Sequence, residues 1–251
     1  MRRVRWVRGV VVCGLAGALV GLVPTGAATL ATRWQCRATA FVDNGGSDAV
    51  SMIDVKTRTK NPADVAVGDD PQGVAVTPDG KTVFVANSLS GTVSTIDVKT
   101  RIKDPDDITV GSAPFTVALT PDGKTAFVAN HGSGTVSTID VNTRTKNPAD
   151  IPVGPSPFDL ALTPDGKTAF VTNRDSGTVS TIDVKTRTKN PTDIPVGSPL
   201  SVAITPDGKT AFVTNRTGTV STIDVKTRTK DPTDIPVGGK PLEVAITPCH
   251  R

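Results

Sequence analysis

Short apolar segments separated by turn-forming residues recur along most of the chain. Around residue 170 they predict four β-strands, at residues 160–163, 168–172, 178–184 and 193–196. Pro164-Asp165-Gly166-Lys167 joins the first two and is typical of a tight turn, because Pro fits the second turn position and Gly tolerates positive φ. Val179, Ile182 and Val184 fall on both faces of the third strand, which indicates a strand covered on both sides.

The same unit is repeated five times. Thr-Pro-Asp-Gly-Lys begins at Thr77, Thr120, Thr163 and Thr205, at intervals of 43, 43 and 42 residues, and a fifth copy begins at Thr247. Phe-Val-x-Asn, Ile-Asp-Val and Val-Gly recur in the same order. Four-stranded units of this length predict an all-β, five-bladed β-propeller of antiparallel blades. A parallel β-helix would need shorter coils with few hairpin turns, and the Pro-Asp-Gly turn argues against it.

The phase of the repeat predicts how the ring closes. The repeats begin at a second strand near Phe41 and finish at a first strand near Val244. We therefore expect the three N-terminal strands and the C-terminal strand to share one blade, which leaves no radial gap. This arrangement predicts twenty strands in a closed, monomeric ring.

Two segments resemble a known family. Phe170-Val171-Thr172-Asn173 and Phe212-Val213-Thr214-Asn215 are similar to the YVTN repeat of YncE-like β-propellers, with Phe in place of Tyr. The surrounding Thr-Pro-Asp-Gly-Lys and Ser-Gly-Thr-Val-Ser-Thr-Ile-Asp also match, and the resemblance covers residues 39–248. It implies a propeller fold, although family propellers usually have seven blades. It implies little about function, because such propellers occur in extracellular proteins with many roles.

The N-terminus predicts export. Arg2, Arg3, Arg5 and Arg8 precede an apolar run at residues 9–23, and small residues follow. This is the pattern of a secretory signal peptide over residues 1–31, with cleavage after Ala28 or Ala31. The apolar run is short for a membrane span, although an uncleaved anchor is the alternative. Residues 32–251 then form a single propeller domain, secreted or associated with the cell envelope.

Charge and cysteine content limit the classes of function and predict a cross-link. The formal net charge is +4, but residues 1–31 supply four Arg and no acid, so the remainder is balanced. Nucleic-acid binding is therefore not expected. Cys36 and Cys249 both align with the Asp of the Pro-Asp-Gly turn, split between the two chain ends. In an oxidising compartment we expect them to form a disulfide across the closing blade.

Candidate chemistry is sparse. The chain has two histidines, His131 and His250, and a single glutamate, Glu243. His131 is expected to lie exposed in a loop, because no carboxylate accompanies it in sequence. Lactonases and lyases with similar propellers need clustered acids with His or Glu, which the sequence lacks. We expect no cofactor, no metal site and no catalytic residues. The repeated Asp of Ile-Asp-Val is expected to accept hydrogen bonds from its own loop.

Two surfaces are candidates for binding. The loop after the third strand carries Lys-Thr-Arg-Thr-Lys, which predicts a basic rim that could hold an anionic polymer, although nearby aspartates could neutralise it. The basic rim comprises Lys56, Arg58, Lys60, Lys99, Arg101, Lys103, Arg144, Lys146, Lys185, Arg187, Lys189, Lys226, Arg228 and Lys230.

On the opposite side the repeats differ from one another, and such variation within a fixed frame can house specificity. This candidate binding face comprises Phe115, His131, Phe158, Arg174, Asp175, Leu200, Arg216 and Leu242. Its apolar members could equally plug the mouth of the channel.

Together these features favour a secreted, non-enzymatic propeller that acts as a binding or scaffold module. Its partner would be a protein or an anionic cell-envelope polymer. The alternatives are a lactonase- or lyase-type enzyme whose polar residues converge only in space, and a propeller subunit of an oxidoreductase with its cofactor on a partner chain.

Overall fold

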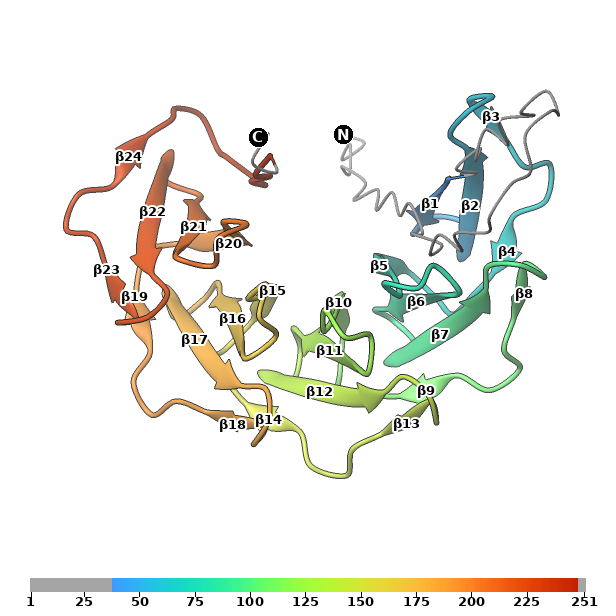
Figure 1. The fold of residues 1–251 in the computed structure, drawn as a ribbon, viewed down its shortest axis with the longest axis horizontal. Coiled ribbons are helices and arrows are strands. Elements are labelled where there is room, and N and C mark those ends of the chain that lie inside the picture. Colours follow the sequence, from blue (N-terminus) through green and yellow to red (C-terminus); the bar gives the residue numbers. More distant parts are fainter. Residues whose placement is uncertain (1–37, 248–251) are drawn as a thin grey trace, which may run out of the picture.

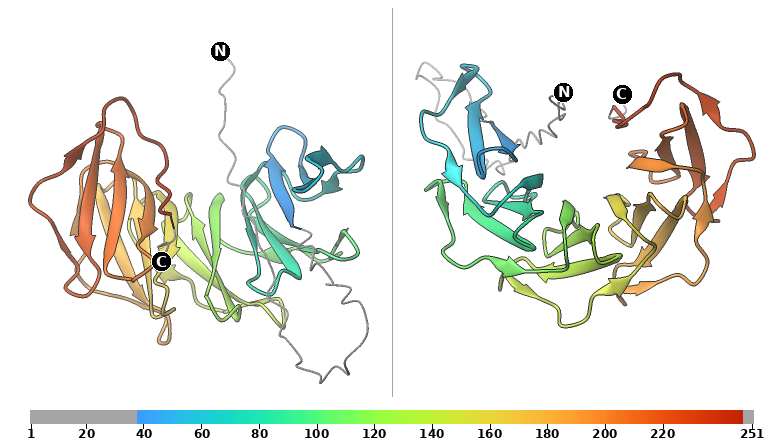
Figure 2. Two further views of the ribbon diagram at one scale, coloured as in Figure 1. Left: turned by 45° about the horizontal axis from the view of Figure 1, so that its top comes forward. Right: turned by 180° about the vertical axis from the view of Figure 1, so that it is seen from behind.

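The computed structural model describes residues 38–247, which form five antiparallel sheets and no helix. The sheets follow one another as blades around an open arc, as Figures 1 and 2 show. The predicted signal peptide, Cys36, Cys249 and His250 lie outside the described residues, so cleavage and the disulfide remain predictions. The all-β propeller fold predicted from the repeats is confirmed.

The first blade holds β1 (Thr39–Asn44), β2 (Ala49–Asp54), β3 (Thr59–Lys60) and β4 (Val65–Ala66). The second holds β5 (Pro71–Val76), β6 (Thr82–Asn87), β7 (Thr92–Asp97), β8 (Ile102–Lys103) and β9 (Ile108–Thr109). The third holds β10 (Pro114–Leu119), β11 (Thr125–Asn130), β12 (Thr135–Asp140), β13 (Thr145–Lys146) and β14 (Ile151–Pro152). The fourth holds β15 (Pro157–Leu162), β16 (Thr168–Asn173), β17 (Thr178–Asp183), β18 (Thr188–Lys189) and β19 (Ile194–Pro195). The fifth holds β20 (Pro199–Ile204), β21 (Thr210–Asn215), β22 (Thr219–Asp224), β23 (Thr229–Lys230) and β24 (Ile235–Pro236).

The outermost strand of each blade is split in two. In the fourth blade β18 and β19 both pair with β17, through Ile182↔Lys189 and Val179↔Ile194. The residues between the two pieces include Pro191, which has no backbone N–H to donate to a ladder. Residues 38–247 therefore contain twenty-four strands rather than the predicted twenty.

The apolar core lies between blades rather than within them. Phe170 and Val179 of the fourth blade pack against Val202, Val213 and Ile223 of the fifth. Equivalent clusters join the first blade to the second, the second to the third, and the third to the fourth. Each blade therefore depends on its neighbour to bury one face, as in other repeat proteins.

A polar relay fixes the outer part of every blade. In the fourth blade the Asn173 amide donates to Ser180 Oγ (2.8 Å), and Ser180 Oγ donates to Asp193 (2.8 Å). Lys189 Nζ lies 2.8 Å from the same Asp193 oxygen. Gly154 packs so tightly on Asn173 that a Cβ there would lie 2.7 Å from Cγ. The relay and this contact explain why Asn, Ser, Gly and Asp recur together in each repeat.

The predicted ring closure is wrong for the described residues. Residues 237–247 form no strand, and β1 remains the innermost strand of the first blade. The first and last blades lie on opposite sides of the opening in Figure 1. Pairing requires neighbouring strands about 4.8 Å apart, and within residues 38–247 β1 pairs with β2 alone.

Candidate functional site

Five members of the predicted binding face gather where the third and fourth blades meet. Phe115 in β10 and Phe158 in β15 stack with ring centroids 4.4 Å apart. His131, in the turn after β11, lies 6.1 Å from the Phe115 ring and 6.3 Å from the Phe158 ring. The Thr116 hydroxyl donates to the Phe158 carbonyl (2.9 Å), which holds the two inner strands together. We call this group, with Arg174 and Asp175, the aromatic cluster.

Charged groups complete the aromatic cluster. The Arg174 guanidinium carbon lies 5.7 Å from the centroid of the Phe158 ring, a distance that permits a cation–π contact. Arg174 Nε is 3.1 Å from one Asp175 oxygen, and the Ser156 hydroxyl donates to the other. Ser156, which the sequence analysis missed, sits at a φ of 54° between two prolines. In the sequence, its position between Pro155 and Pro157 was the feature that could have marked this turn.

Burial sets the protonation state of this cluster. It lowers the pKa of His131, the positive charge of Arg174 lowers it further, and Asp175 opposes the change. The imidazole is therefore neutral at neutral pH. The pKa of Asp175 is lowered by its bonds from Ser156 and Arg174, so this carboxylate stays ionised. His131 is half-buried against aromatic rings, which corrects the expectation of an exposed loop residue.

The other three members of the predicted face do not join the cluster. Leu200 is only 5% exposed, and its carbonyl accepts a hydrogen bond from Thr172 Oγ1 (3.1 Å). Arg216 is exposed in the turn after β21, and Leu242 lies outside any strand. Their spacing in the repeat predicted that these residues share one face of the propeller. The burial of each residue depends on the contacts that its own blade makes.

The last lysine of each rim loop is held by an aspartate four residues later. These ion pairs span 2.7–2.8 Å and tie the lysine to the polar relay of its blade. The pairs are Lys60 with Asp64, Lys103 with Asp107, Lys146 with Asp150, Lys189 with Asp193, and Lys230 with Asp234. These five cations therefore have a structural role.

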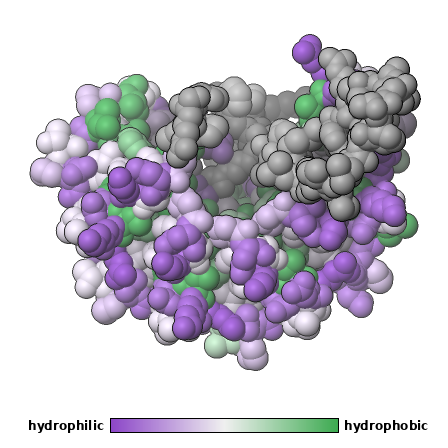
Figure 3. Space-filling model, viewed as in Figure 1, coloured by the Kyte–Doolittle hydropathy of each residue, from purple (hydrophilic) through white to green (hydrophobic). Residues whose placement is uncertain are grey.

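The rim arginines occupy left-handed turn positions, with φ between 56° and 61°. Three of them reach the preceding blade, where Arg144 bonds Asp104, Arg187 bonds Asn147 and Arg228 bonds Asn190. These contacts tie neighbouring blades together. The first lysine of the loop remains exposed, as at Lys99, Lys185 and Lys226. Figure 3 shows hydrophilic residues over much of this face of the molecule.

The aspartate of Ile-Asp-Val has the predicted local role. Asp183 accepts a hydrogen bond from the Thr186 backbone N–H (2.7 Å), and the equivalent bond is present in each of the other blades. These bonds lower the pKa of Asp183 below its ordinary value. The repeated carboxylate is thus a turn-stabilising residue.

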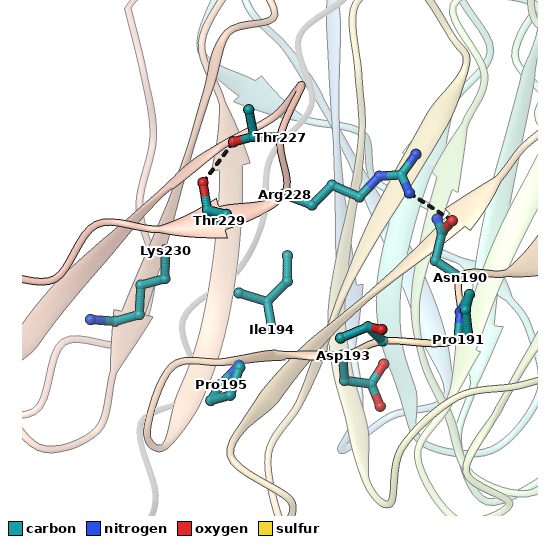
Figure 4. A pocket seen from close by; sticks show the side chains of 10 residues that line it. Asn190, Pro191, Asp193, Ile194, Pro195, Thr227, Arg228, Thr229 and Lys230 are labelled. Atoms are coloured by element: carbon teal, nitrogen blue, oxygen red, sulfur yellow. Dashed lines mark hydrogen bonds between the residues drawn. The ribbon is translucent and has the colours of Figure 1, made fainter.

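A groove at the outer edge separates the fourth and fifth blades. It has a volume of about 620 Å³ and is lined by residues 190–195 and 227–230. Figure 4 shows Arg228 spanning it, with its guanidinium 2.7 Å from the Asn190 oxygen. Because this contact is one of the ties between blades, the groove is a consequence of blade packing.

Among residues 38–247, no group of three or more His, Cys, Asp or Glu side chains could hold a metal ion. Within the same range, no helix has the length and apolar character needed to cross a bilayer.

Repeated antiparallel blades around a common axis define a β-propeller. Residues 3–105 match the family model described as YNCE-like β-propeller, which confirms the predicted resemblance. The chain is also similar to hydrazine synthase of Kuenenia stuttgartiensis, with 27% identity and a TM-score of 0.72 over 79% of this chain and 62% of that chain. A functionally unknown protein from Desulfotomaculum acetoxidans DSM 771 is 16% identical, with a TM-score of 0.67 over 75% of this chain and 62% of that one. The chain thus spans less than two thirds of either solved chain. No curated protein matches it.

Proposed function

We propose that the chain is an exported, non-enzymatic propeller that binds an acidic cell-envelope polymer at the aromatic cluster. The observation that carries this proposal is the convergence of Phe115, His131, Phe158 and Arg174 from two blades on the side where the repeats differ. In the other blades the phenylalanine position holds Gln72, Leu200 or Leu242, so within residues 38–247 two phenyl rings stack only where the third and fourth blades meet. Residues 1–31 would direct export.

The chemistry of the cluster suits an acidic sugar. Stacked phenyl rings offer an apolar surface to the faces of sugar rings. The guanidinium of Arg174 is the charged donor suited to a carboxylate, which would take over contacts now made to Asp175. The neutral His131 can donate or accept one further hydrogen bond. The exposed lysines of the basic rim would add long-range attraction that salt screens.

Binding of fluorescently labelled polygalacturonate to the chain without residues 1–31 tests this proposal, with neutral dextran as the control polymer. Arg174→Gln should weaken binding by roughly tenfold, the effect of losing a charge-assisted contact of about 1.5 kcal/mol. Phe158→Ala should weaken it to a similar extent, because it removes a ring on which the sugar would stack. Arg216→Gln removes the same charge from the equivalent turn of the next blade and should bind as the unmodified chain does. Equal binding of dextran, or unchanged binding by Arg174→Gln, would contradict the proposal.

A second candidate is a propeller subunit of an enzyme complex. The similarity to hydrazine synthase over 79% of this chain favours it. A cofactor would then come from the partner chain, because residues 38–247 offer no cluster of metal-binding side chains. Purification of the tagged chain from its native source would test this. A stoichiometric partner with cofactor absorbance is the expected result, and a chain recovered alone would contradict it.

A further inference from the structure

We propose that Asp175 sets the affinity of the aromatic cluster, because its carboxylate occupies the position that the carboxylate of a bound ligand takes. An external carboxylate then replaces Asp175 on Arg174 and Ser156. The inference rests on the proposed function for the identity of the ligand, and it adds the residue that regulates the same site. The exchange itself can be tested without the polymer.

The carboxylate of Asp175 is a feature of one turn rather than of the repeat. Asp175 is the second residue of the turn after β16, and the same place holds Gly46, Leu89 and Gly132 in the first three blades. The corresponding turn of the fifth blade is one residue shorter. Among residues 38–247, only the fourth blade therefore carries a carboxylate at this place.

The hydroxyl that meets Asp175 comes from the loop before β15. The Arg174 backbone N–H donates to the Ser156 carbonyl (3.1 Å), and the equivalent bond in the third blade joins His131 to Ala113 (2.9 Å). Ala113 has no hydroxyl to donate, and no carboxylate follows His131 in its turn. The third blade thus has the same backbone contact without either side-chain group.

Each oxygen of Asp175 has its own donor. Arg174 Nε lies 3.1 Å from one oxygen, and the Ser156 hydroxyl donates to the other. Two donors from different segments, one to each oxygen, can hold a carboxylate of the chain or of a ligand equally well. The Arg174 guanidinium carbon lies 5.7 Å from the centroid of the Phe158 ring. This carboxylate position therefore borders the apolar surface on which a sugar would stack.

The contact is accessible enough to exchange. The Arg174 side chain is 34% exposed and the Asp175 side chain is 54% exposed. Ion pairs this open to water contribute little to folding, so the chain loses little when Asp175 leaves. The bonds from Ser156 and Arg174 lower the pKa of Asp175, so its carboxylate is charged at neutral pH and competes with the ligand there.

Reaction of the purified chain with phenylglyoxal, followed by mass spectrometry of the peptide that contains Arg174, tests the exchange directly. Asp175→Asn removes the charge and keeps the size of the side chain. Arg174 should then react roughly two- to fivefold faster, whereas Arg216, in the equivalent turn of the fifth blade, should react at an unchanged rate. Acetate at constant ionic strength should slow the reaction of Arg174, and more strongly in Asp175→Asn. An unchanged rate at Arg174, or no effect of acetate, overturns the proposal.

A second variant tests whether the hydroxyl holds the incoming carboxylate. Ala113 has a φ of 49° at the position equivalent to Ser156, which has a φ of 54°, so Ser156→Ala keeps the backbone conformation. Added to Asp175→Asn, it should reduce the protection by acetate roughly two- to tenfold, because one of the two donors is lost. Ser198→Ala, in the corresponding loop of the fifth blade, is the matched control and should leave the protection unchanged. Equal protection with and without the Ser156 hydroxyl overturns the assignment.

Binding of labelled polygalacturonate separates this inference from the proposed function. Asp175→Asn should bind the polymer roughly two- to fivefold more tightly than the unmodified chain. Asp69→Asn removes the same charge from the equivalent loop of the second blade and should change binding by less than about twofold, because salt screens distant exposed charges. If acetate protects Arg174 but neither form binds the polymer, the proposed polymer is wrong and the carboxylate position stands. If Asp175→Asn binds the polymer no more tightly, the role of Asp175 is wrong and the proposed function stands.

Discussion

The third and fifth blades have nearly the same sequence but bury it to different extents. Phe127 of the third blade is inaccessible, whereas the equivalent Phe212 of the fifth is partly exposed. Ile151 of the third blade is 5% exposed, and its counterpart Ile235 is 46% exposed. The register that pairs this phenylalanine with the next strand is the same in both blades, as Phe127↔Thr138 and Phe212↔Thr222. The difference therefore comes from the neighbouring blade, which covers Phe127 but is missing beside Phe212.

This comparison indicates where the stability of the arc resides. Blade-to-blade packing buries the large apolar side chains, while the strands and turns of one blade satisfy its own polar groups. In such an architecture stability is approximately a sum of repeat and interface terms. Substitutions in apolar interfaces should therefore depend on position along the arc, and substitutions in local turns should not.

The largest expected effect comes from truncating the phenylalanine that recurs in each blade, in two blades that cover it differently. Phe127→Ala should lower the free energy of unfolding by about 3–5 kcal/mol, because it opens a cavity in a filled interface. Phe212→Ala should cost less, about 1–2 kcal/mol, because that side chain is already partly exposed. Urea unfolding of both variants measures the two losses in free energy of unfolding. Equal losses would mean that the end blade is covered in solution.

Substituting two glycines, one in a tight contact and one in open space, should give an intermediate effect on stability. Gly154→Ala would place a Cβ 2.7 Å from Asn173 Cγ, in the tight contact beneath the polar relay. We expect a loss of about 1–3 kcal/mol in the free energy of unfolding. Gly46→Ala, in a turn of the first blade, meets nothing within 4 Å and should change stability by less than about 0.5 kcal/mol. Thermal or urea unfolding distinguishes the two, and a neutral Gly154→Ala would contradict the importance of this contact.

The smallest expected effect is the contribution of the turn aspartates to stability in acid. Backbone and hydroxyl bonds from Thr143 lower the pKa of Asp140, and Thr227 does the same for Asp224. A carboxylate with a lowered pKa contributes its stability above the ordinary value of 3.8 and loses it as pH falls below that value. Asp140→Asn and Asp224→Asn should each remove a small and similar part of the pH dependence in this acid range. Acid unfolding followed by circular dichroism measures it. A larger change at Asp140 would show that the turn senses its neighbour.

Much of the fold could be predicted from the repeat because its signals are local. Turn residues, apolar alternation and a constant interval placed β15, β16 and β17 within a few residues. The split outer strand was missed because each piece is only two residues long and carries no alternation. The repeat placed Phe115, His131, Phe158 and Arg174 on one face. Only the packing of the third blade against the fourth brings their side chains into contact, since these residues are far apart along the chain.

The sequence by itself determined the blades, their order, and the turn and relay residues, because those depend on hydrogen bonds and φ preferences within one repeat. Tertiary structure alone decided that the arc stays open, that Leu200 is buried, that His131 is half-buried, and that rim arginines tie blades together. These outcomes depend on the packing angle between blades and on what lies against each face. No single repeat encodes that information, because every repeat buries its apolar face only against the next.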